Sequence, residues 1–293
     1  MRAALEGKLA LVTGGSSGIG ASVASALAAR GAHVILVARD PARLDAVAAR
    51  IRAAGGTCTT YIADLADPAA VQDLGLRVAS ELGTPDILIN SAGAGRWLSL
   101  LETSAVEAAE MVAAPYLAAF NVTREFVRGM VERRSGRVVN VTSVAARLAW
   151  PGAIGYIAAR RAMEGFHAAL GAELFGTGVS ATLVVLGTVE SPYWEHNPGS
   201  RERVPTARGP RTLTLEEAAD AIVSAVEHGR RRVVRPASFR LLFLLSEVFP
   251  GLMEKVLAGP NRGAPPLRPT NGGRIPPGPE RRTDASQPSG PPS

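Results

Sequence analysis

The chain has 293 residues, of which 46% are hydrophobic and 20% charged, and its formal net charge is +6. This length supports one large α/β domain with a buried core or two small domains, and the composition is that of a globular protein. The positive charge does not indicate a nucleic-acid partner, because half of it lies in the last 34 residues and the body has no basic stripe with interleaved aromatic residues.

The cysteine and histidine content excludes further kinds of site. Cys58 is the only cysteine, so an internal disulfide and a cysteine metal cluster are excluded, and the four histidines show no ligand spacing. We therefore expect no metal site. The N-terminal MRAALEGK has no apolar stretch of the kind found in signal peptides, and no segment reaches 18 apolar residues. Together with the cysteine content, this predicts a cytoplasmic protein.

Apolar strands alternate with helices from residue 9 to residue 186. The pattern predicts strands at 9–13, 33–38, 57–62, 86–90, 137–142 and 179–186, and helices at 19–30, 41–54, 68–82, 103–133 and 155–175. Continuous apolar strands between helices are typical of a parallel sheet covered on both faces. The fold class is therefore α/β, a doubly wound parallel sheet in a single domain. Such a sheet binds its ligand beyond the carboxyl ends of the strands.

The pattern changes after residue 186. A loop rich in proline and glycine runs from 190 to 213, and a loop of this length inside a domain is usually a functional lid. Thr214 and Glu217 form a capping box for a helix that Gly229 ends, and residues 231–235 predict a last strand. We place the domain at 1–236, an apolar helical extension at 237–259 and a disordered tail, rich in proline, glycine and arginine, at 260–293.

The extension contains the run FRLLFLLSEVFPGLMEKVLA at 239–258, which is apolar on all sides before Glu247 and Pro250 interrupt it. One interpretation is a terminal helix that packs on its own subunit or on a neighbouring one. The alternative is a hydrophobic flap that covers a lipophilic substrate or makes peripheral contact with a membrane surface.

A glycine-rich turn, TGGSSGIG, stands at residues 13–20 between the first strand and the first helix. Gly14 allows a tight turn, Gly18 lets the backbone approach a pyrophosphate, and Gly20 permits close packing of helix on strand. The N-terminus of the helix offers N–H donors to phosphates. This context predicts a dinucleotide site in a Rossmann-like fold.

A second group of residues could carry acid–base chemistry. Tyr156 and Arg160 are four residues apart and share one face of the predicted helix, while Ser143 follows the fifth strand. A cation beside a phenol favours the phenolate and lowers the pKa of the tyrosine. Taken alone, a tyrosine and an arginine at this spacing more often belong to a solvated helix face.

These motifs in this order resemble the short-chain dehydrogenase/reductase family over about residues 7–236. The resemblance rests on the TGGSSGIG turn, Asp64-Leu65, Asn90-Ser-Ala-Gly93, Ser143, Tyr156 with a cation four residues later, and Leu186-Gly-Thr-Val189. It implies hydride transfer between a nicotinamide and a carbonyl or carbinol carbon. It also implies Tyr156 as acid–base, Ser143 holding the substrate oxygen, and a homo-oligomer, since similar proteins commonly pair through the helices at 103–133 and 155–175.

The resemblance also assigns a cofactor site. Asp64 would bind the adenine, Ala92 and Gly93 would line the nucleotide, and Gly187 and Val189 would contact the nicotinamide end. The remaining expected cofactor contacts are Gly14, Ser16, Ser17, Gly18, Ile19, Gly20, Arg39, Leu65, Asn90, Tyr156 and Arg160.

Arg39 bears on the choice of cofactor. The second strand ends in Ala38 and Arg39, where enzymes preferring NAD(H) carry an acid that holds the ribose 2′-hydroxyl. A guanidinium pairs with a 2′-phosphate, so we expect NADP(H) rather than NAD(H). The alternative is that Arg39 only pairs with Asp40 or with solvent.

The sequence departs from the family pattern at three places, one of which is Leu186-Gly187, where the family usually has Pro-Gly after the sixth strand. Arg160 stands where the family has a lysine, and neither lysine of the chain, Lys8 or Lys255, could replace it. A guanidinium keeps the charge but does not give up its proton near neutrality, so it cannot relay one. Pro115 stands at the position of the family's asparagine, and a proline inside a helix frees a carbonyl and kinks the axis.

Two functions remain open on the sequence. The first is an NADP(H)-dependent oxidoreductase that uses Ser143, Tyr156 and Arg160. The second is a nucleotide-binding protein with little or no turnover, used for sensing or assembly. Trp150, Tyr193 and Trp194 would surround the nicotinamide, which suggests a hydrophobic small-molecule alcohol or carbonyl compound, although these aromatic residues could equally fill the core under the lid.

Overall fold

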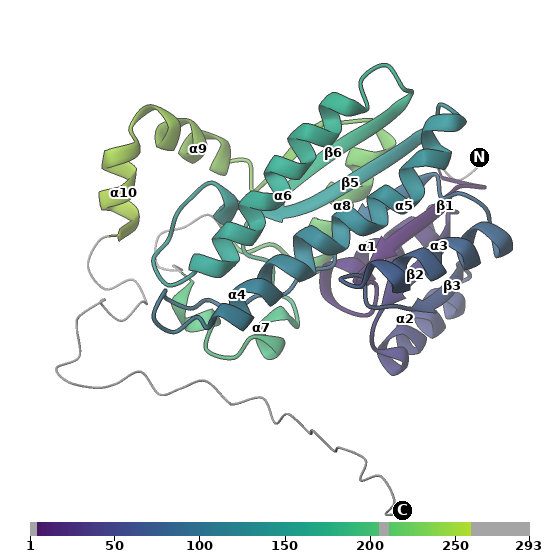
Figure 1. Ribbon diagram of the computed structural model, residues 1–293, viewed down its shortest axis with the longest axis horizontal. Helices are drawn as coiled ribbons and strands as arrows, with labels where there is room; N and C mark the ends of the chain where they lie inside the picture. Colours follow the sequence, from purple (N-terminus) through teal and green to yellow (C-terminus); the bar gives the residue numbers. More distant parts are fainter. Residues whose placement is uncertain (1–4, 205–210, 259–293) are drawn as a thin grey trace, which may run out of the picture.

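The computed structural model describes residues 5–204 and 211–258 and shows a single seven-stranded parallel sheet between two layers of helices (Figure 1). The strand order is β3-β2-β1-β4-β5-β6-β7. The strands are β1 Leu9–Thr13, β2 His33–Ala38, β3 Thr57–Ile62, β4 Ile87–Asn90, β5 Gly136–Ser143, β6 Val179–Leu186 and β7 Arg232–Arg235. This confirms the predicted doubly wound sheet, and the strand order reverses between β1 and β4, where such sheets bind ligands.

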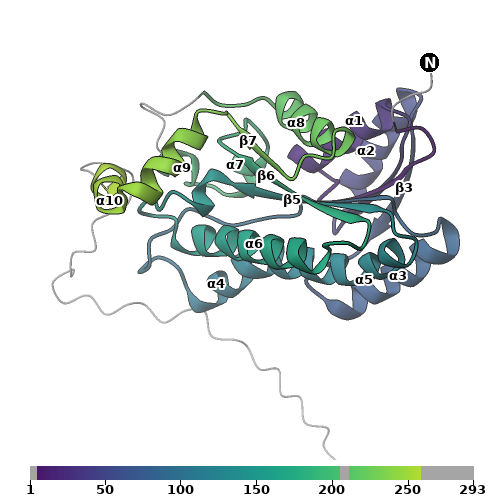
Figure 2. The same ribbon diagram turned by 90° about the horizontal axis from the view of Figure 1, so that it is seen from above.

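Helices cover both faces of the sheet (Figure 2), and a hydrophobic layer holds them on each face. One layer packs α1 Gly18–Ala29, α2 Pro41–Ala53 and α8 Leu215–Glu227 against the sheet, and the other packs α3 Pro68–Glu81, α5 Ala118–Glu132 and α6 Ile154–Glu173. Strands β1, β2, β4 and β6 are buried on both faces, which explains why their sequences are apolar runs, whereas the edge strand β3 is partly exposed and contains three threonines.

The helix starts follow from local sequence. Asp40 and Asp67 each accept a backbone N–H at the starts of α2 and α3, where a proline follows at the first helical position. The expected capping box of Thr214 and Glu217 is present at α8, and Ser104 and Glu107 form a second one at α4 Ala105–Val112.

The predicted helix at 103–133 is not continuous. A π-helical segment, Ala113–Leu117, separates α4 from α5 and has Pro115 at its centre. Pro115 has no N–H to complete the α-helical ladder, so the chain takes one wider turn and Ala118 donates to the carbonyl of Ala113, five residues back. The expected distortion at Pro115 is therefore present as a π-bulge.

The prediction of one helix at 239–258 is wrong. The segment forms two helices, α9 Phe239–Val248 and α10 Pro250–Ala258 (Figure 1). Pro250 begins the second helix, and its ring would clash with a carbonyl one turn earlier if α9 continued. The predicted lid contains a short helix, α7 Tyr193–His196, and a 3₁₀ turn, Arg201–Arg203. The loop residues 205–210 and the predicted disordered tail at 260–293 lie outside the described residues.

Candidate active site

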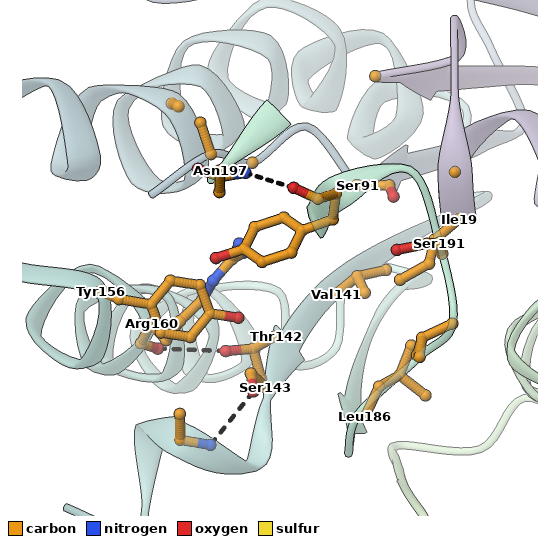
Figure 3. A pocket seen from close by; sticks show the side chains of 18 of the residues that line it. Ile19, Ser91, Val141, Thr142, Ser143, Tyr156, Arg160, Leu186, Ser191 and Asn197 are labelled. Atoms are coloured by element: carbon orange, nitrogen blue, oxygen red, sulfur yellow. Dashed lines mark hydrogen bonds between the residues drawn. The ribbon is translucent and has the colours of Figure 1, made fainter. Parts of the chain in front are cut away.

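A large cavity lies beyond the carboxyl ends of the strands (Figure 3). Its volume is about 1810 Å³, well above the 300–1,000 Å³ usual for one small ligand. The loops after β1, β2, β3, β4, β5 and β6 all contribute lining residues, as do the lid and α9 and α10. The cavity is therefore large enough for a dinucleotide together with a second molecule.

The glycine-rich turn forms one end of the cavity. Gly14 and Gly18 have φ of +68° and +52°, a conformation that favours glycine. A Cβ on Gly20 would lie 2.2 Å from the carbonyl oxygen of Gly14, whereas a Cβ on Gly18 would meet only Ser191, at 3.9 Å. Ser17 precedes α1 without capping it by its side chain, so the first N–H groups of the helix remain available to a ligand. These features fit a bound pyrophosphate.

Thr13 is a site residue that the sequence interpretation did not single out. Its Oγ1 donates to the carbonyl of Ile89 at 3.2 Å and accepts from the backbone N–H groups of Ser91 and Ala92, both at 3.0 Å. This side chain fixes the loop after β4 to the end of β1, at the point where the strand order reverses. Two features of the sequence could have identified Thr13: it is the last residue of the first strand and the first residue of the TGGSSGIG turn.

Arg39 lies at the same end of the cavity and is exposed. Asp40, its expected alternative partner, instead pairs with Arg43, with Nε and Oδ2 3.2 Å apart, and Arg43 also contacts His196. Within 5–204 and 211–258, Arg39 forms no salt bridge. Its guanidinium is thus available to an anionic ligand. The contribution of Arg43 and His196 to the lining was not predicted.

The other expected cofactor residues lie along this wall, with one exception. Asp64 and Leu65 lie in the lining after β3, and Ala92, Gly93, Gly187 and Val189 lie in it after β4 and β6. Asn90 does not line the cavity. It is buried beneath it, where its Nδ2 donates to Thr123 and Asn140, each at 2.9 Å. Asn90 therefore stabilises the strands below the site rather than presenting its side chain to a ligand.

Ser143, Tyr156 and Arg160 come together in the middle of the cavity (Figure 3). Ser143 ends β5, and its Oγ accepts the backbone N–H of Ala145 at 3.2 Å, which leaves its proton free to donate. Tyr156 and Arg160 project from α6, which is fixed to β5 by a 3.3 Å hydrogen bond from Thr142 Oγ1 to the carbonyl of Arg160.

The guanidinium of Arg160 lies over the ring of Tyr156, with Cζ 4.9 Å from the ring centroid, the geometry of a cation–π contact. It reaches as far as Gly93, where an added Cβ would be only 2.7 Å from Nη2. Its Nε is buried and has no hydrogen-bond partner in the described part of the chain. A buried donor without a partner is costly, and a ligand oxygen at this place would satisfy it.

Aromatic side chains surround Tyr156. The ring of Trp97 lies 6.0 Å from it and that of Tyr193 6.2 Å, while Trp150 contacts Trp97 and Trp194 contacts Tyr193. All of them line the cavity, and it stays a prediction that Trp150, Tyr193 and Trp194 surround a nicotinamide. The Tyr193 hydroxyl donates to the carbonyl of Gly95, and burial raises its pKa, so it remains a donor at neutral pH. Aromatic side chains therefore make up much of the cavity wall around Tyr156.

The lid is held at several points along 193–203. Ser200 Oγ accepts the backbone N–H of Trp97 at 3.0 Å, and Arg203 forms a bidentate salt bridge with Glu102 at 2.6 and 2.8 Å. The hydrogen bonds from Arg203 are the main reason why the pKa of Glu102 falls to about 2. The lid is thereby fixed to the segment that follows β4.

No asparagine occupies the position of Pro115. The cavity wall there consists of Ala113 and Ala114 from the π-helical segment, and Asn121 points elsewhere, donating to the carbonyl of Leu65 at 3.0 Å. In the residues that the structure describes, no cluster of histidine, cysteine, aspartate and glutamate could hold a metal ion. No helix among them is long and apolar enough to cross a membrane. Leu241, Leu244 and Leu252 of the extension are exposed, and membrane contact through it remains a prediction.

Comparison with known proteins agrees with this geometry. The sequence profile described as short chain dehydrogenase matches residues 8–201. An uncharacterized oxidoreductase of Mycobacterium tuberculosis (strain ATCC 25618 / H37Rv) is 36% identical over 258 residues, covering 86% of this chain and 73% of the relative. A fatty acyl-CoA reductase of Acinetobacter baylyi is 31% identical over 231 residues, covering 78% of this chain and 76% of that protein.

Solved structures show the same fold. A short-chain dehydrogenase from Sphingobium yanoikuyae in complex with NADPH superposes with a TM-score of 0.71 at 26% identity, over 84% of this chain and 95% of that one. Other chains of this fold were solved with NADP or with NAD. With the matched profile and the relatives above, the chain belongs to the short-chain dehydrogenase/reductase family of oxidoreductases.

Proposed function

We propose that this protein is an NADP(H)-dependent oxidoreductase that interconverts a hydrophobic alcohol and its carbonyl compound. The observation that carries the proposal is the meeting of Ser143, Tyr156 and Arg160 in the middle of one cavity whose end is a phosphate-binding turn. When bound, the cofactor supplies or accepts the hydride. The chain's own residues bind the cofactor, orient the substrate and move one proton.

The cofactor would be held at its pyrophosphate and at its 2′-phosphate. Gly14 to Gly20 and the N-terminus of α1 fit the pyrophosphate, and the free guanidinium of Arg39 fits a 2′-phosphate. Ala38 brings no carboxylate to oppose that phosphate. This favours NADP(H) over NAD(H), and the NADPH complex of the Sphingobium relative is consistent with it.

In carbonyl reduction, the Tyr156 hydroxyl donates its proton to the substrate oxygen while the carbonyl carbon accepts the hydride. Ser143 Oγ donates a hydrogen bond to the same oxygen and holds it as negative charge develops. Arg160 supplies positive charge beside Tyr156 and hydrogen-bond donors for ribose hydroxyls. Because a guanidinium keeps its proton near neutrality, we assign Arg160 an electrostatic and binding role rather than a relay role.

The substrate would be hydrophobic because Trp97, Trp150 and Tyr193 surround the reacting position. The name of the Acinetobacter relative, a fatty acyl-CoA reductase, is consistent with a lipophilic substrate.

A second candidate function is supported by Pro115 and Arg160. The π-helical wall brings no side-chain amide to the cavity, and the lysine that similar proteins use is absent. A protein of this kind would bind NADP(H) with little turnover and act in sensing or assembly.

NADPH oxidation measured against a panel of ketones and aldehydes separates the two functions. We expect turnover by the wild type, and Tyr156→Phe should remove it, while the variant should still bind NADPH through the glycine-rich turn and Arg39. NADPH binding without turnover on any carbonyl compound would favour the second function. Turnover that survives in Tyr156→Phe would contradict the mechanism.

A further inference from the structure

The end of the cavity farthest from the glycine-rich turn is built by two segments that are distant in sequence. Val144 and Leu148 belong to the segment that follows Ser143, whereas Leu242, Met253 and Leu257 belong to α9 and α10. All five side chains belong to one larger hydrophobic cluster, in which Met253 and Leu257 are 8% and 9% exposed. The helices of the extension are thus a wall of the cavity that contains Tyr156.

This end of the cavity offers a ligand no polar side chain. The charged residues of the lining come from the nucleotide end, from α4, from α6 and from the lid, and none comes from α9, α10 or residues 144–148. A polar group placed here would lose its water without gaining a hydrogen-bonding side chain. Leucine, valine and methionine side chains suit a flexible hydrocarbon, and methionine adapts to irregular shapes.

We propose that this end is a subsite for an aliphatic chain, so that the substrate is a long-chain alcohol or aldehyde. Its reacting carbon would lie at Ser143 and Tyr156 and its tail between residues 144–148 and the α9–α10 pair. The proposal rests on the proposed function, because it places the reacting carbon at the same site. Beyond that function, the proposal specifies a long aliphatic substrate and names the residues that would select for chain length.

The α9–α10 pair supplies matched controls, because each helix has one apolar face in the cavity wall and another in solvent. Leu242 lines the cavity, while its neighbour Leu241 is 62% exposed. Met253 lines it as well, while Leu252 is 61% exposed. Substitutions at adjacent positions therefore separate an effect on the subsite from a general effect on the helices.

The test measures the binding of straight-chain primary alcohols, from butanol to dodecanol, by isothermal titration calorimetry in the presence of NADPH, which cannot oxidise an alcohol. We expect the affinity to rise about fourfold for each added methylene until the tail fills the subsite. In Leu242→Asp the affinity for decanol should fall at least about tenfold, because a carboxylate would lie against the hydrocarbon. Leu241→Asp should bind decanol like the wild type, and butanol should bind both variants equally.

The pair Met253→Trp and Leu252→Trp repeats the test if Leu242→Asp does not fold. The inner tryptophan should shorten the longest chain that binds, and the outer one should not. Affinity that does not change with chain length, or equal effects of the inner and outer substitutions, would overturn the proposal.

Steady-state rates with straight-chain aldehydes distinguish this inference from the proposed function. Length-dependent binding of alcohols without any turnover would leave the subsite standing and remove the proposed reaction. Turnover of small carbonyl compounds at rates that do not depend on chain length would support the proposed reaction and rule out the subsite.

Discussion

Arg160 lies against the face of Tyr156, with its Cζ 4.9 Å from the ring centroid, and its far end reaches the backbone at Gly93. The larger guanidinium is accommodated because Gly93 has no side chain. The positive charge that similar proteins obtain from a lysine is therefore present in this site, delivered by a planar group with several donors.

Removing this charge should impair both binding and chemistry. In Arg160→Met we expect NADPH affinity to fall about tenfold, since hydrogen bonds from a charged donor contribute about 1.5–3 kcal/mol. We expect kcat to fall at least about a hundredfold, the lower range for assisted proton transfer. Cofactor fluorescence titration and initial rates measure the two effects.

Arg160→Lys is the matched control because it keeps the charge. NADPH affinity and kcat should stay within about tenfold of the wild type, a difference of about 1.4 kcal/mol. A gain in kcat well beyond that range would mean that the guanidinium limits the wild-type enzyme.

Arg39 should decide between the two nicotinamide cofactors. Arg39→Ala should weaken NADPH binding about 10- to 100-fold, since the lost pairing with a 2′-phosphate is a charge-assisted one. NADH lacks that phosphate, so its affinity should not change. Competitive titration with both cofactors measures the ratio.

Arg43→Ala is the comparison for Arg39, because Arg43 is already engaged by Asp40 and His196. We expect it to change the preference for NADPH much less than Arg39→Ala does. Equal loss of NADPH and NADH affinity in Arg39→Ala would contradict the assignment of the 2′-phosphate site.

Much of this architecture could be predicted from the sequence because its signals are local. The spacing of Gly14, Gly18 and Gly20 predicts the phosphate-binding turn, and the capping box of Thr214 and Glu217 predicts the start of α8. Tyr156 and Arg160 are one helical turn apart, so the helix alone brings them together.

The features that escaped prediction depend on contacts between distant segments. The hydroxyl of Tyr193 donates a hydrogen bond to the carbonyl of Gly95, which is 98 residues away in the sequence. Leu257 belongs to the same hydrophobic cluster as Val144. No periodicity encodes such contacts. The break between α9 and α10 was visible as Pro250, but whether a proline kinks a helix or begins a new one depends on what the two halves pack against.

Two glycines should respond oppositely to alanine. Gly20→Ala places a Cβ 2.2 Å from the carbonyl oxygen of Gly14, and two backbone segments must move to relieve it. We expect a loss of about 3 kcal/mol in the free energy of unfolding, together with loss of NADPH binding. Urea unfolding and cofactor titration measure the two effects.

Gly171 in α6 has no heavy atom within 4 Å of the Cβ position, so Gly171→Ala meets open space. Alanine in a helix is favoured over glycine by about 0.5–1 kcal/mol, and we expect a gain of that size with unchanged NADPH affinity. If Gly20→Ala were as stable as Gly171→Ala, the close packing of α1 on β1 would be disproved.

The salt bridge between Glu102 and Arg203 should make the attachment of the lid depend on pH. Hydrogen bonds from Arg203 lower the pKa of Glu102 from 4.5 to about 2 in the folded protein. A carboxyl group with a depressed folded pKa stabilises the folded state above its unfolded pKa, and this stabilisation is lost as the pH falls through the folded value. The loss should therefore occur between about pH 4.5 and pH 2.

Because both side chains are partly exposed, we expect Glu102→Gln to lower the free energy of unfolding by only about 1 kcal/mol at pH 7. The difference from the wild type should shrink as the pH falls through that window. Glu132→Gln is the control, since its salt bridge with Arg128 is largely exposed and should contribute less than about 0.5 kcal/mol.

Hydrogen exchange shows whether the loss of this salt bridge loosens the lid itself. In Glu102→Gln the backbone amides of residues 200–204 should exchange faster at pH 7, while those of α8 should not change, because the salt bridge of Arg203 and Glu102 joins the lid to the segment after β4 and includes no residue of α8. A difference in unfolding free energy that stays constant from pH 7 to pH 2, or equal exchange in the two proteins, would mean that this salt bridge does not hold the lid.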